Sequence, residues 1–291
     1  MTPEASDDVL VVGDLMVDIV VVPSGPLQHG SDTPAAIRTV GGGSAANTAC
    51  WLAALGQRVR LVACVGDDPV GRGAVAELAA AGVEFAGDVD PVHPTGACVV
   101  LVDPDGERTM LPDRGANDAL RPATVERALA ERRPAWLHVS GYTLLDSGSR
   151  PAALAAMATA HELGVPISVD ASSASPLLTV GGARFLDWVT GCRILFANDD
   201  EMAALDGADA AVRRAEVVVV KHGPAGSSWV TSTGRRSVPA TPVVVVDTVG
   251  AGDALDAGVI DAVRRGFEPQ AALEAASAVA ARAAGTAGAR P

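Results

Sequence analysis

Basic residues are scarce in this sequence, and the scarcity excludes several classes of function. The 291 residues carry 35 acidic against 22 basic side chains, a formal net charge of −13. Nucleic acids and anionic membranes are held by clustered Lys and Arg, so we expect neither as a partner. The one lysine, Lys221, is followed by His222, so the Gly-Lys-Ser/Thr loop of P-loop NTPases is absent. The His-Arg-Asp and Asp-Phe-Gly triplets of protein kinases are absent as well.

Cysteines are few, and long apolar runs are missing. The four cysteines lie far apart, form no Cys-x-x-Cys pair and sit in apolar stretches, which predicts reduced and buried thiols. No run reaches the ~18 uninterrupted apolar residues that cross a bilayer. The N-terminal segment is acidic, the wrong charge for a signal peptide. We therefore expect a cytoplasmic protein.

Apolar, β-branched runs alternate with alanine- and leucine-rich segments along most of the chain. The runs are continuous, which is typical of strands buried on both faces. We expect strands at 9–12, 59–65, 136–139, 167–169, 194–196, 217–220 and 243–246, and helices at 45–55, 70–81, 124–130, 151–163 and 201–205. The alternation predicts one α/β domain, residues 1–291, with a mostly parallel central sheet.

Two segments break this alternation. Residues 19–40 lack a helical period, and residues 96–111 resemble a hairpin around a turn at 103–106. We expect the two segments to pair into a small β-sheet that forms a lid; two ordinary surface excursions are the alternative. One face of such a sheet would stay uncovered, which predicts a homodimer through the lid. The apolar residues behind this expectation are Val20, Val22, Val99 and Leu101.

The segment Asp247–Asp253 carries the strongest chemical signal. Its sequence, Asp-Thr-Val-Gly-Ala-Gly-Asp, follows an apolar run and opens a helical segment. The amides of Gly250, Ala251 and Gly252 would lie at a helix N-terminus, where the helix dipole favours an anion. Asp253 could accept a proton from an attacking hydroxyl while charge builds on a phosphoryl group. A glycine turn with Asp253 as a helix cap is the plainer alternative.

A second glycine-rich segment, residues 41–47, precedes another expected helix. Gly42 and Gly43 would let a bulky ligand approach the backbone, and Asn47 can both donate and accept hydrogen bonds, as recognition of a polyol or ribose requires. Asp18 follows the first strand, where a carboxylate can grip two sugar hydroxyls. The alternatives are a flexible turn that begins a helix and a solvated acid.

Two further patterns lie between these segments. Asn198-Asp-Asp-Glu201 follows a strand and starts a helix, and its carboxylates could hold Mg²⁺ through water. An acidic helix start that complements the dipole is the alternative. Lys221-His-Gly223-Pro-Ala-Gly226 follows the next strand, and its glycines could admit a nucleotide phosphate; a hairpin turn is the alternative.

In this order, the four segments resemble the ribokinase-like, or PfkB, carbohydrate kinase family over essentially the whole chain. The resemblance implies a three-layer α/β/α domain with a β lid. It also implies that ATP with Mg²⁺ phosphorylates a primary hydroxyl on a sugar or nucleoside. The joint occurrence of the four segments is more specific than any one of them.

The resemblance also implies roles for individual residues. It assigns Asp253 as the base and the turn before it, Gly250 to Gly252, as the anion hole. The implied acceptor-binding residues are Asp18, Gly42, Gly43 and Asn47. The implied Mg²⁺, phosphate and nucleotide residues are Asn198, Glu201, Lys221, Gly223 and Gly226. Asp247 and Thr248 fall where family members often shape a monovalent-cation loop, which leaves potassium activation open.

The acceptor is less clearly indicated than the chemistry. Nucleoside kinases usually sandwich the base between aromatic rings, and the two lid segments contain no Phe, Tyr or Trp. We therefore expect a small sugar, with a nucleoside as the alternative. Arg108 and Arg114 could pair with a carboxylate or phosphate on the acceptor, or serve as solvated hairpin charges. A sensor that binds sugar or nucleotide without turnover is the alternative from another class, and the presence of Asp253 and its glycines argues against it.

Overall fold

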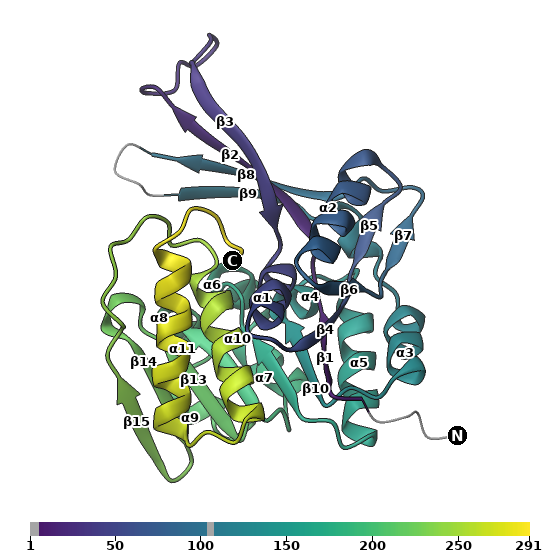
Figure 1. Cartoon of the computed structure of the whole chain (residues 1–291), viewed down its shortest axis with the longest axis vertical. Helices are drawn as coiled ribbons and strands as arrows, with labels where there is room; N and C mark the ends of the chain where they lie inside the picture. Colours follow the sequence, from purple (N-terminus) through teal and green to yellow (C-terminus); the bar gives the residue numbers. More distant parts are fainter. Residues whose placement is uncertain (1–5, 104–107) are drawn as a thin grey trace.

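The computed structural model describes residues 6–103 and 108–291 (Figure 1). Its body is a nine-stranded sheet with helices on both faces, and a four-stranded sheet projects from one end of the body. Neighbouring strands of the main sheet run parallel except at the edge formed by β13, β14 and β15. The expected α/β class with a mostly parallel central sheet is confirmed.

The strands of the main sheet are, in spatial order, β15 (Gly234–Val238), β14 (Ser227–Thr231), β13 (Val217–Lys221), β12 (Ile194–Asn198), β11 (Ile167–Asp170), β10 (Trp136–Ser140), β1 (Asp8–Val12), β4 (Arg58–Val62) and β6 (Val83–Phe85). One face carries α1 (Ser44–Ala54), α2 (Pro69–Ala80), α10 (Ala251–Arg264) and α11 (Pro269–Ala284). The other face carries α3 (Pro122–Glu131), α4 (Gly141–Leu145), α5 (Arg150–Glu162), α6 (Ala174–Val180), α7 (Gly182–Trp188), α8 (Asp199–Ala204) and α9 (Ala208–Ala211).

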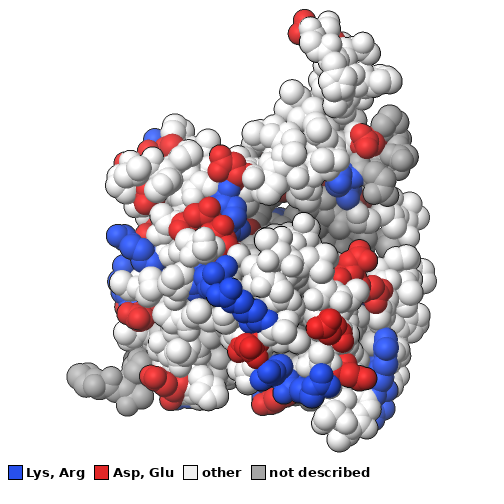
Figure 2. Space-filling model, turned by 180° about the vertical axis from the view of Figure 1, so that it is seen from behind, with Lys and Arg blue, Asp and Glu red and all other residues white. Residues whose placement is uncertain are grey.

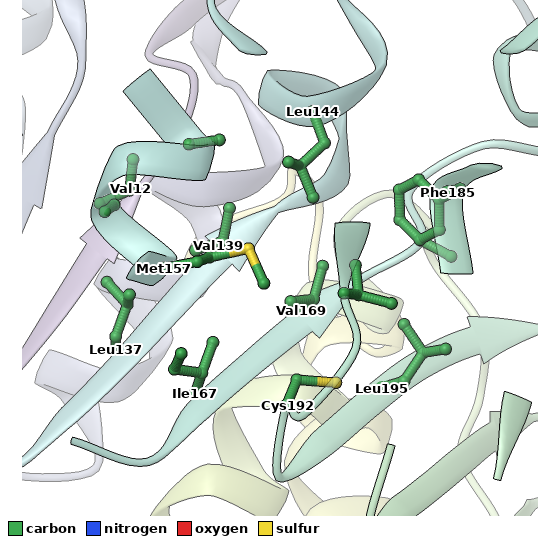
Figure 3. Packing of buried hydrophobic residues seen from close by; sticks show 14 of the residues in the cluster. Val12, Leu137, Val139, Leu144, Met157, Ile167, Val169, Phe185, Cys192 and Leu195 are labelled. Atoms are coloured by element: carbon green, nitrogen blue, oxygen red, sulfur yellow. The ribbon is translucent and has the colours of Figure 1, made fainter. Parts of the chain in front are cut away.

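Alternate residues along each strand belong to two separate cores. Val9 packs in the core under α1 and α10, whereas its neighbour Leu10 packs in the core under α5, because successive strand side chains point to opposite faces. Figure 3 shows part of the second core, where Val139, Val169 and Leu195 come from neighbouring strands. Burial on both faces explains why the strands are continuous apolar runs.

The projecting sheet, called the small sheet below, joins two segments far apart in the chain. Its order is β3 (Ala35–Gly42), β2 (Met16–Pro23), β8 (Gly96–Val102) and β9 (Arg108–Asp113). The central pair, β2 and β8, is parallel, with Met16 opposite Gly96 and Val21 opposite Leu101. A separate two-stranded sheet, β5 (Cys64–Gly66) and β7 (Asp88–Asp90), lies at its base. The turn expected at 103–106 lies, beyond residue 103, outside the described residues.

Two expectations about strands were wrong. Residues 243–246 form no strand, and Val244 is 86% exposed; prolines at 239 and 242 interrupt the chain after β15, and the segment instead runs beside α11, where the Val246 amide donates to the Ala284 carbonyl. The run at 59–65 is divided between β4 and β5.

The expected uncovered face of the small sheet was also assigned wrongly. In the strand register Val20 lies opposite Val100, so Val99 and Leu101 point to the other face. Val20 is buried. The outward apolar residues are Ile19, Val21, Ile37, Val99, Leu101 and Leu111.

The surface in Figure 2 shows acidic and basic side chains interspersed over one face of the molecule. All four cysteines are buried and unbonded. Among the described residues, no helix has the length and apolar character that crossing a bilayer requires.

Candidate active site

The two glycine-rich segments meet at the carboxylate of Asp253. Its Oδ2 accepts a hydrogen bond from Asn47 Nδ2 at 2.9 Å, and its Oδ1 accepts one from Ser44 Oγ at 2.8 Å. Burial raises the pKa of Asp253 to about 7; the bonds from Asn47 and Ser44 oppose that rise, and nearby Asp170 adds to it. A carboxyl with this pKa is poised to take a proton near neutral pH.

Helix α10 starts in the manner that the glycines predict. Gly250 caps it in the left-handed conformation, φ 75°, and a Cβ there would lie 2.5 Å from the Ala289 carbonyl oxygen, so only glycine fits without strain. Asp253 falls in the first turn, where the helix dipole favours a negative charge. The sequence predicts an unpaired Ala251 amide. The amide instead donates a hydrogen bond to the Thr248 carbonyl at 3.3 Å.

Of the predicted acceptor residues, Asn47 contacts Asp253 directly, and Gly42 adjoins Asp18. A Cβ on Gly42 would lie 2.1 Å from Asp18 Oδ1, so the glycine lets this carboxylate rest against the backbone. Gly43 takes φ 93°, and a Cβ there would lie 2.6 Å from the Asp14 carbonyl oxygen. Burial raises the pKa of Asp18 to about 6. The sequence therefore brings together Asp18, the glycines, Asn47 and Asp253 in one place.

Arg290 reaches the same place from the C-terminal segment, whose end lies between the body and the small sheet (Figure 1). Its Nη2 donates to the Gly42 carbonyl at 2.7 Å and its Nε to Asn47 Oδ1 at 3.2 Å. The Asn47 amide is thus held at both ends, by Arg290 and by Asp253, and its orientation is fixed.

The Lys221 side chain is largely buried and contacts two carboxylates. Its Nζ donates to Asp170 Oδ1 at 2.9 Å and lies 3.2 Å from both carboxylate oxygens of Asp256. Burial alone would lower the pKa of Lys221, but Asp170, Asp256 and Glu201 hold it well above its ordinary value. The ammonium is a permanent positive charge behind the start of α10, where a Cβ on Gly252 would lie 3.5 Å from Nζ.

The Asn198 and Glu201 pair caps helix α8. The Glu201 carboxylate accepts from the Asn198 amide at 2.8 Å and from Asn198 Nδ2 at 2.7 Å, while Asn198 Oδ1 accepts from the Glu201 amide at 2.8 Å. This reciprocal arrangement satisfies the free amides of the helix start. Burial, with Asp170 adding, raises the pKa of Glu201 to about 7, and the positive charge of Lys221 opposes that rise.

The remaining nucleotide-loop residues adjoin this cap. Lys221 lies opposite Asn198 in the β12–β13 register, and His222 Nδ1 is 2.7 Å from Asp199 Oδ1. Gly226 has φ 101°, and a Cβ there would lie 2.0 Å from the Val238 carbonyl oxygen. Gly223 begins the short 3₁₀ turn between them with φ 55°. The loop and the α8 cap therefore lie side by side.

Asp247 is surrounded by donors. Its Oδ1 accepts from Arg108 Nη2 at 2.6 Å and from the Val249 amide at 2.9 Å, and its Oδ2 accepts from the Gly288 amide at 3.1 Å. Arg108 also donates through Nη1 to Thr248 Oγ1 at 2.7 Å. The Arg108 guanidinium therefore bridges Asp247 and Thr248, the two residues predicted to shape a monovalent-cation loop.

Between the small sheet and the segment after residue 245 lies a cavity of about 190 Å³. That is below the ~300–1,000 Å³ of pockets for drug-sized ligands, so it suits a small molecule. Its lining is Asp18, Val20, Val22, Arg38, Val40, Val100, Val102, Arg108, Val246, Asp247, Val249, Gly288 and Ala289. Arg114, the other arginine considered for the acceptor, instead pairs with Asp118 at 2.7 Å.

Several residues near Asp253 and Lys221 were not predicted from the sequence. Asp170 ends β11, and Asp256 follows Asp253 by three residues on α10. The position at a strand end could have indicated Asp170, and the i, i+3 spacing from Asp253 could have indicated Asp256. Nothing in the sequence connected Arg290 or Ser44 with Asp253.

A sequence profile of the pfkB family of carbohydrate kinases matches residues 6–291. An ATP-dependent ribose-1-phosphate kinase of Halopiger xanaduensis is 38% identical over 262 residues, covering 87% of this chain and 83% of that protein.

Solved structures with similar folds cover almost the whole chain. The adenosine kinase of Sinorhizobium meliloti has a TM-score of 0.86 at 27% identity and covers 99% of this chain and 96% of that one. A putative ribokinase II of E. coli in complex with ATP and Mg²⁺ has a TM-score of 0.85 at 24% identity, covering 98% of this chain and 94% of that one.

Proposed function

Since the chain belongs to the pfkB family of carbohydrate kinases, we propose that it transfers a phosphoryl group from ATP to a primary hydroxyl of a small sugar. It is a phosphotransferase with an alcohol group as acceptor. The contact that carries the proposal is the one between Asn47 and Asp253, which joins two segments 206 residues apart. It places an acceptor-binding amide and a candidate base side by side.

Asp253 is the base in this mechanism. The acceptor oxygen attacks the terminal phosphorus of ATP, its proton passes to the Asp253 carboxylate, and the bond to ADP breaks. The first-turn position on α10 aims helix amides at the charge that develops on the phosphoryl group. Lys221, charged and 3.5 Å from the position of a Cβ on Gly252, adds positive potential behind this turn.

Mg²⁺ would be held through water beside Glu201. Among the described residues, no group of three or more His, Cys, Asp or Glu side chains is arranged to hold a metal. A single buried carboxylate fits Mg²⁺, which keeps several waters and takes further oxygens from substrate phosphates. When bound, Mg²⁺ neutralises phosphate charge. Asn198, Gly223 and Gly226 would form the edge that holds the nucleotide.

Asp18, Gly42, Gly43 and Asn47 hold the acceptor. A sugar is favoured because, within the described residues, no aromatic side chain lines the cavity, and a nucleoside base calls for one. The structural similarity to an adenosine kinase keeps a nucleoside as the second candidate. Ribose 1-phosphate, the acceptor that the Halopiger protein's name gives, belongs in the first panel.

A coupled assay of ADP release over pentoses, hexoses, sugar phosphates and nucleosides tests the proposal. Turnover with one sugar class should fall at least ~10²-fold in Asp253→Asn, whereas Asp261→Asn, on the same helix, should keep it. Near-normal turnover of Asp253→Asn would remove the mechanism. Calorimetric binding of sugar with no ADP release from any acceptor would favour the non-catalytic sensor.

We propose that Arg108 supplies the positive charge at Asp247 and that potassium is not required. The Asp247 carboxylate already accepts from Arg108, Val249 and Gly288. Equal turnover in sodium and potassium buffers supports this, and strong activation by potassium alone would contradict it.

We further propose that the small sheet is a lid and that two copies of the chain form a homodimer through it. We also propose that the protein is cytoplasmic. Its inner face lines the cavity, and Ile37 on its outer face is 66% exposed. Buried free thiols suit a reducing compartment. Light scattering at micromolar concentration tests the dimer, and cell fractionation tests the location.

A further inference from the structure

We propose that the acceptor carries a phosphate group of its own, bound by Arg38 and Arg108 at the far end of the cavity. The inference rests on the proposed kinase function and names the substrate class for the same site. The product would be a sugar with two phosphates.

The cavity has two chemically different ends. Register places Arg38 opposite Val20, two residues along β2 from Asp18, so the two side chains share one face of the small sheet. Two strand residues span roughly 7 Å, enough to place a sugar ring between them. Arg108 lies opposite Val102 on β9 and lines the same cavity. An acceptor held at Asp18 would thus direct its other end toward the two arginines.

The other side chains of the small sheet that line the cavity are apolar. They are Val20, Val22, Val40, Val100 and Val102, and the register places Val40 opposite Asp18 and Val20 opposite Arg38. These side chains offer no hydrogen bonds, so they suit the carbon face of a sugar and leave polar recognition to the two ends. Binding of sugar hydroxyls alone therefore does not account for the two arginines at the far end.

Both guanidinium groups keep donors for a ligand. The Asp247 carboxylate is 3.8 Å from Arg38 Nη2, beyond its short bonds to Arg108, Val249 and Gly288. Arg38 is half-exposed, with 51% of its side chain accessible. Arg108 uses Nη1 and Nη2 for one bond each, and each guanidinium has five N–H donors. Asp247 therefore holds the two guanidinium groups near one point, and both groups keep N–H donors for a ligand.

The geometry favours a phosphate over a carboxylate. The arginines project from different strands, β3 and β9, at opposite edges of the small sheet. A planar carboxylate matches one guanidinium fork, whereas the three free oxygens of a phosphate ester can take donors from two directions. Two arginines against one aspartate leave a net positive charge at that end.

The chemistry of the transfer is unchanged by this second group. The attacking hydroxyl loses its proton to Asp253, the bond from the terminal phosphorus of ATP to ADP breaks, and the acceptor's own phosphate keeps all its bonds. That phosphate serves to anchor and orient the acceptor, which is the use of binding energy that lowers the barrier at a remote reacting atom.

The test compares kcat/KM for sugars and their monophosphates, beginning with D-ribose and ribose 1-phosphate, and includes a sugar acid. The phosphorylated acceptor should exceed its parent sugar at least ~10²-fold, because charge-assisted hydrogen bonds dominate the difference. Arg38→Gln should reduce this preference ~10-fold or more and Arg38→Glu further, while Arg213→Gln, an exposed arginine on the body, should leave it unchanged.

Three results would overturn the inference: equal kcat/KM for sugar and sugar phosphate, a preference for the sugar acid, or a preference untouched by Arg38→Glu. In each of them, ADP release from a neutral sugar that still depends on Asp253 would leave the proposed kinase function standing. Loss of that dependence would instead remove the kinase mechanism, so the two failures are distinguishable.

Discussion

The body and the small sheet contribute to the site in different ways. On the body, Lys221 forms buried ion pairs with Asp170 and Asp256. Asp253 lies on a helix whose residues Ala254 and Leu255 belong to a core. The small sheet has its own cluster of only a few buried residues, Met16, Val20, Cys98 and Val100. The proposed chemistry thus depends on residues of the densely packed body.

In the proposed mechanism, the small sheet distinguishes one acceptor from another. Asp18, Arg38 and Arg108 come from three of its strands, and it meets the body at the Arg108–Asp247 pair. Changes on the body should therefore reduce stability and turnover, whereas changes on the small sheet should alter acceptor preference.

The largest expected loss of stability is at Lys221, on the body. Lys221→Met leaves Asp170 and Asp256 buried without their cation, and breaking a buried pair from one side costs about 3–5 kcal/mol. Urea unfolding should show this loss, and Arg236→Met, on the exposed edge strand β15, should not. A Lys221→Met protein as stable as the parent would contradict the structural importance of the cluster.

Gly250→Ala should lower turnover by more than the strain of its positive φ alone would. The new Cβ would meet the Ala289 carbonyl at 2.5 Å, and displacing the helix start by an ångström can cost ~10²-fold in rate. Gly56→Ala is the control, because it shares a positive φ, 88°, but its Cβ would meet nothing within 4 Å. Equal kcat in the two variants would separate the glycine from the chemistry.

Arg108→Ala tests where the two regions meet. Without the guanidinium, Asp247 loses its bond at 2.6 Å. We expect kcat/KM to fall ~10-fold and the variant to become responsive to potassium. Rates measured in sodium and potassium buffers check this, and a variant that behaves as the parent in both would remove the proposed role of Arg108.

Ile37→Asp should have the smallest effect on catalysis. The residue lies on the outer face of the small sheet and is 66% exposed, so turnover should stay within ~2-fold, as for most surface substitutions. If that face forms the dimer, light scattering should show a monomer. A dimer that persists in Ile37→Asp would place the interface elsewhere.

Much of the body could be predicted from the sequence because its signals are local. Valine-rich runs marked β1 and β13, and the glycine turn marked the start of α10. The run at 243–246 has the same composition but finds no strand to pair with, because pairing depends on tertiary contacts and not on propensity.

The site could be predicted only where its residues stand in such local patterns. Asp253 and Asn47 belong to glycine segments that begin helices. Arg290 joins Asn47 across 243 residues, and Arg38 reaches the cavity through a strand register that a one-residue shift would reverse. Long-range contacts and register therefore account for what the sequence reading missed.

The central claim is that Asp253 takes the acceptor's proton. The measurement is kcat/KM for the acceptor between pH 5 and 9, which reports the free enzyme. Since burial raises the pKa of Asp253 to about 7, activity should rise with pH through that value as the carboxyl ionises. Asp170→Asn removes a neighbouring negative charge and should move the rise to lower pH. A flat profile, or the same rise retained in the residual activity of Asp253→Asn, would contradict the account.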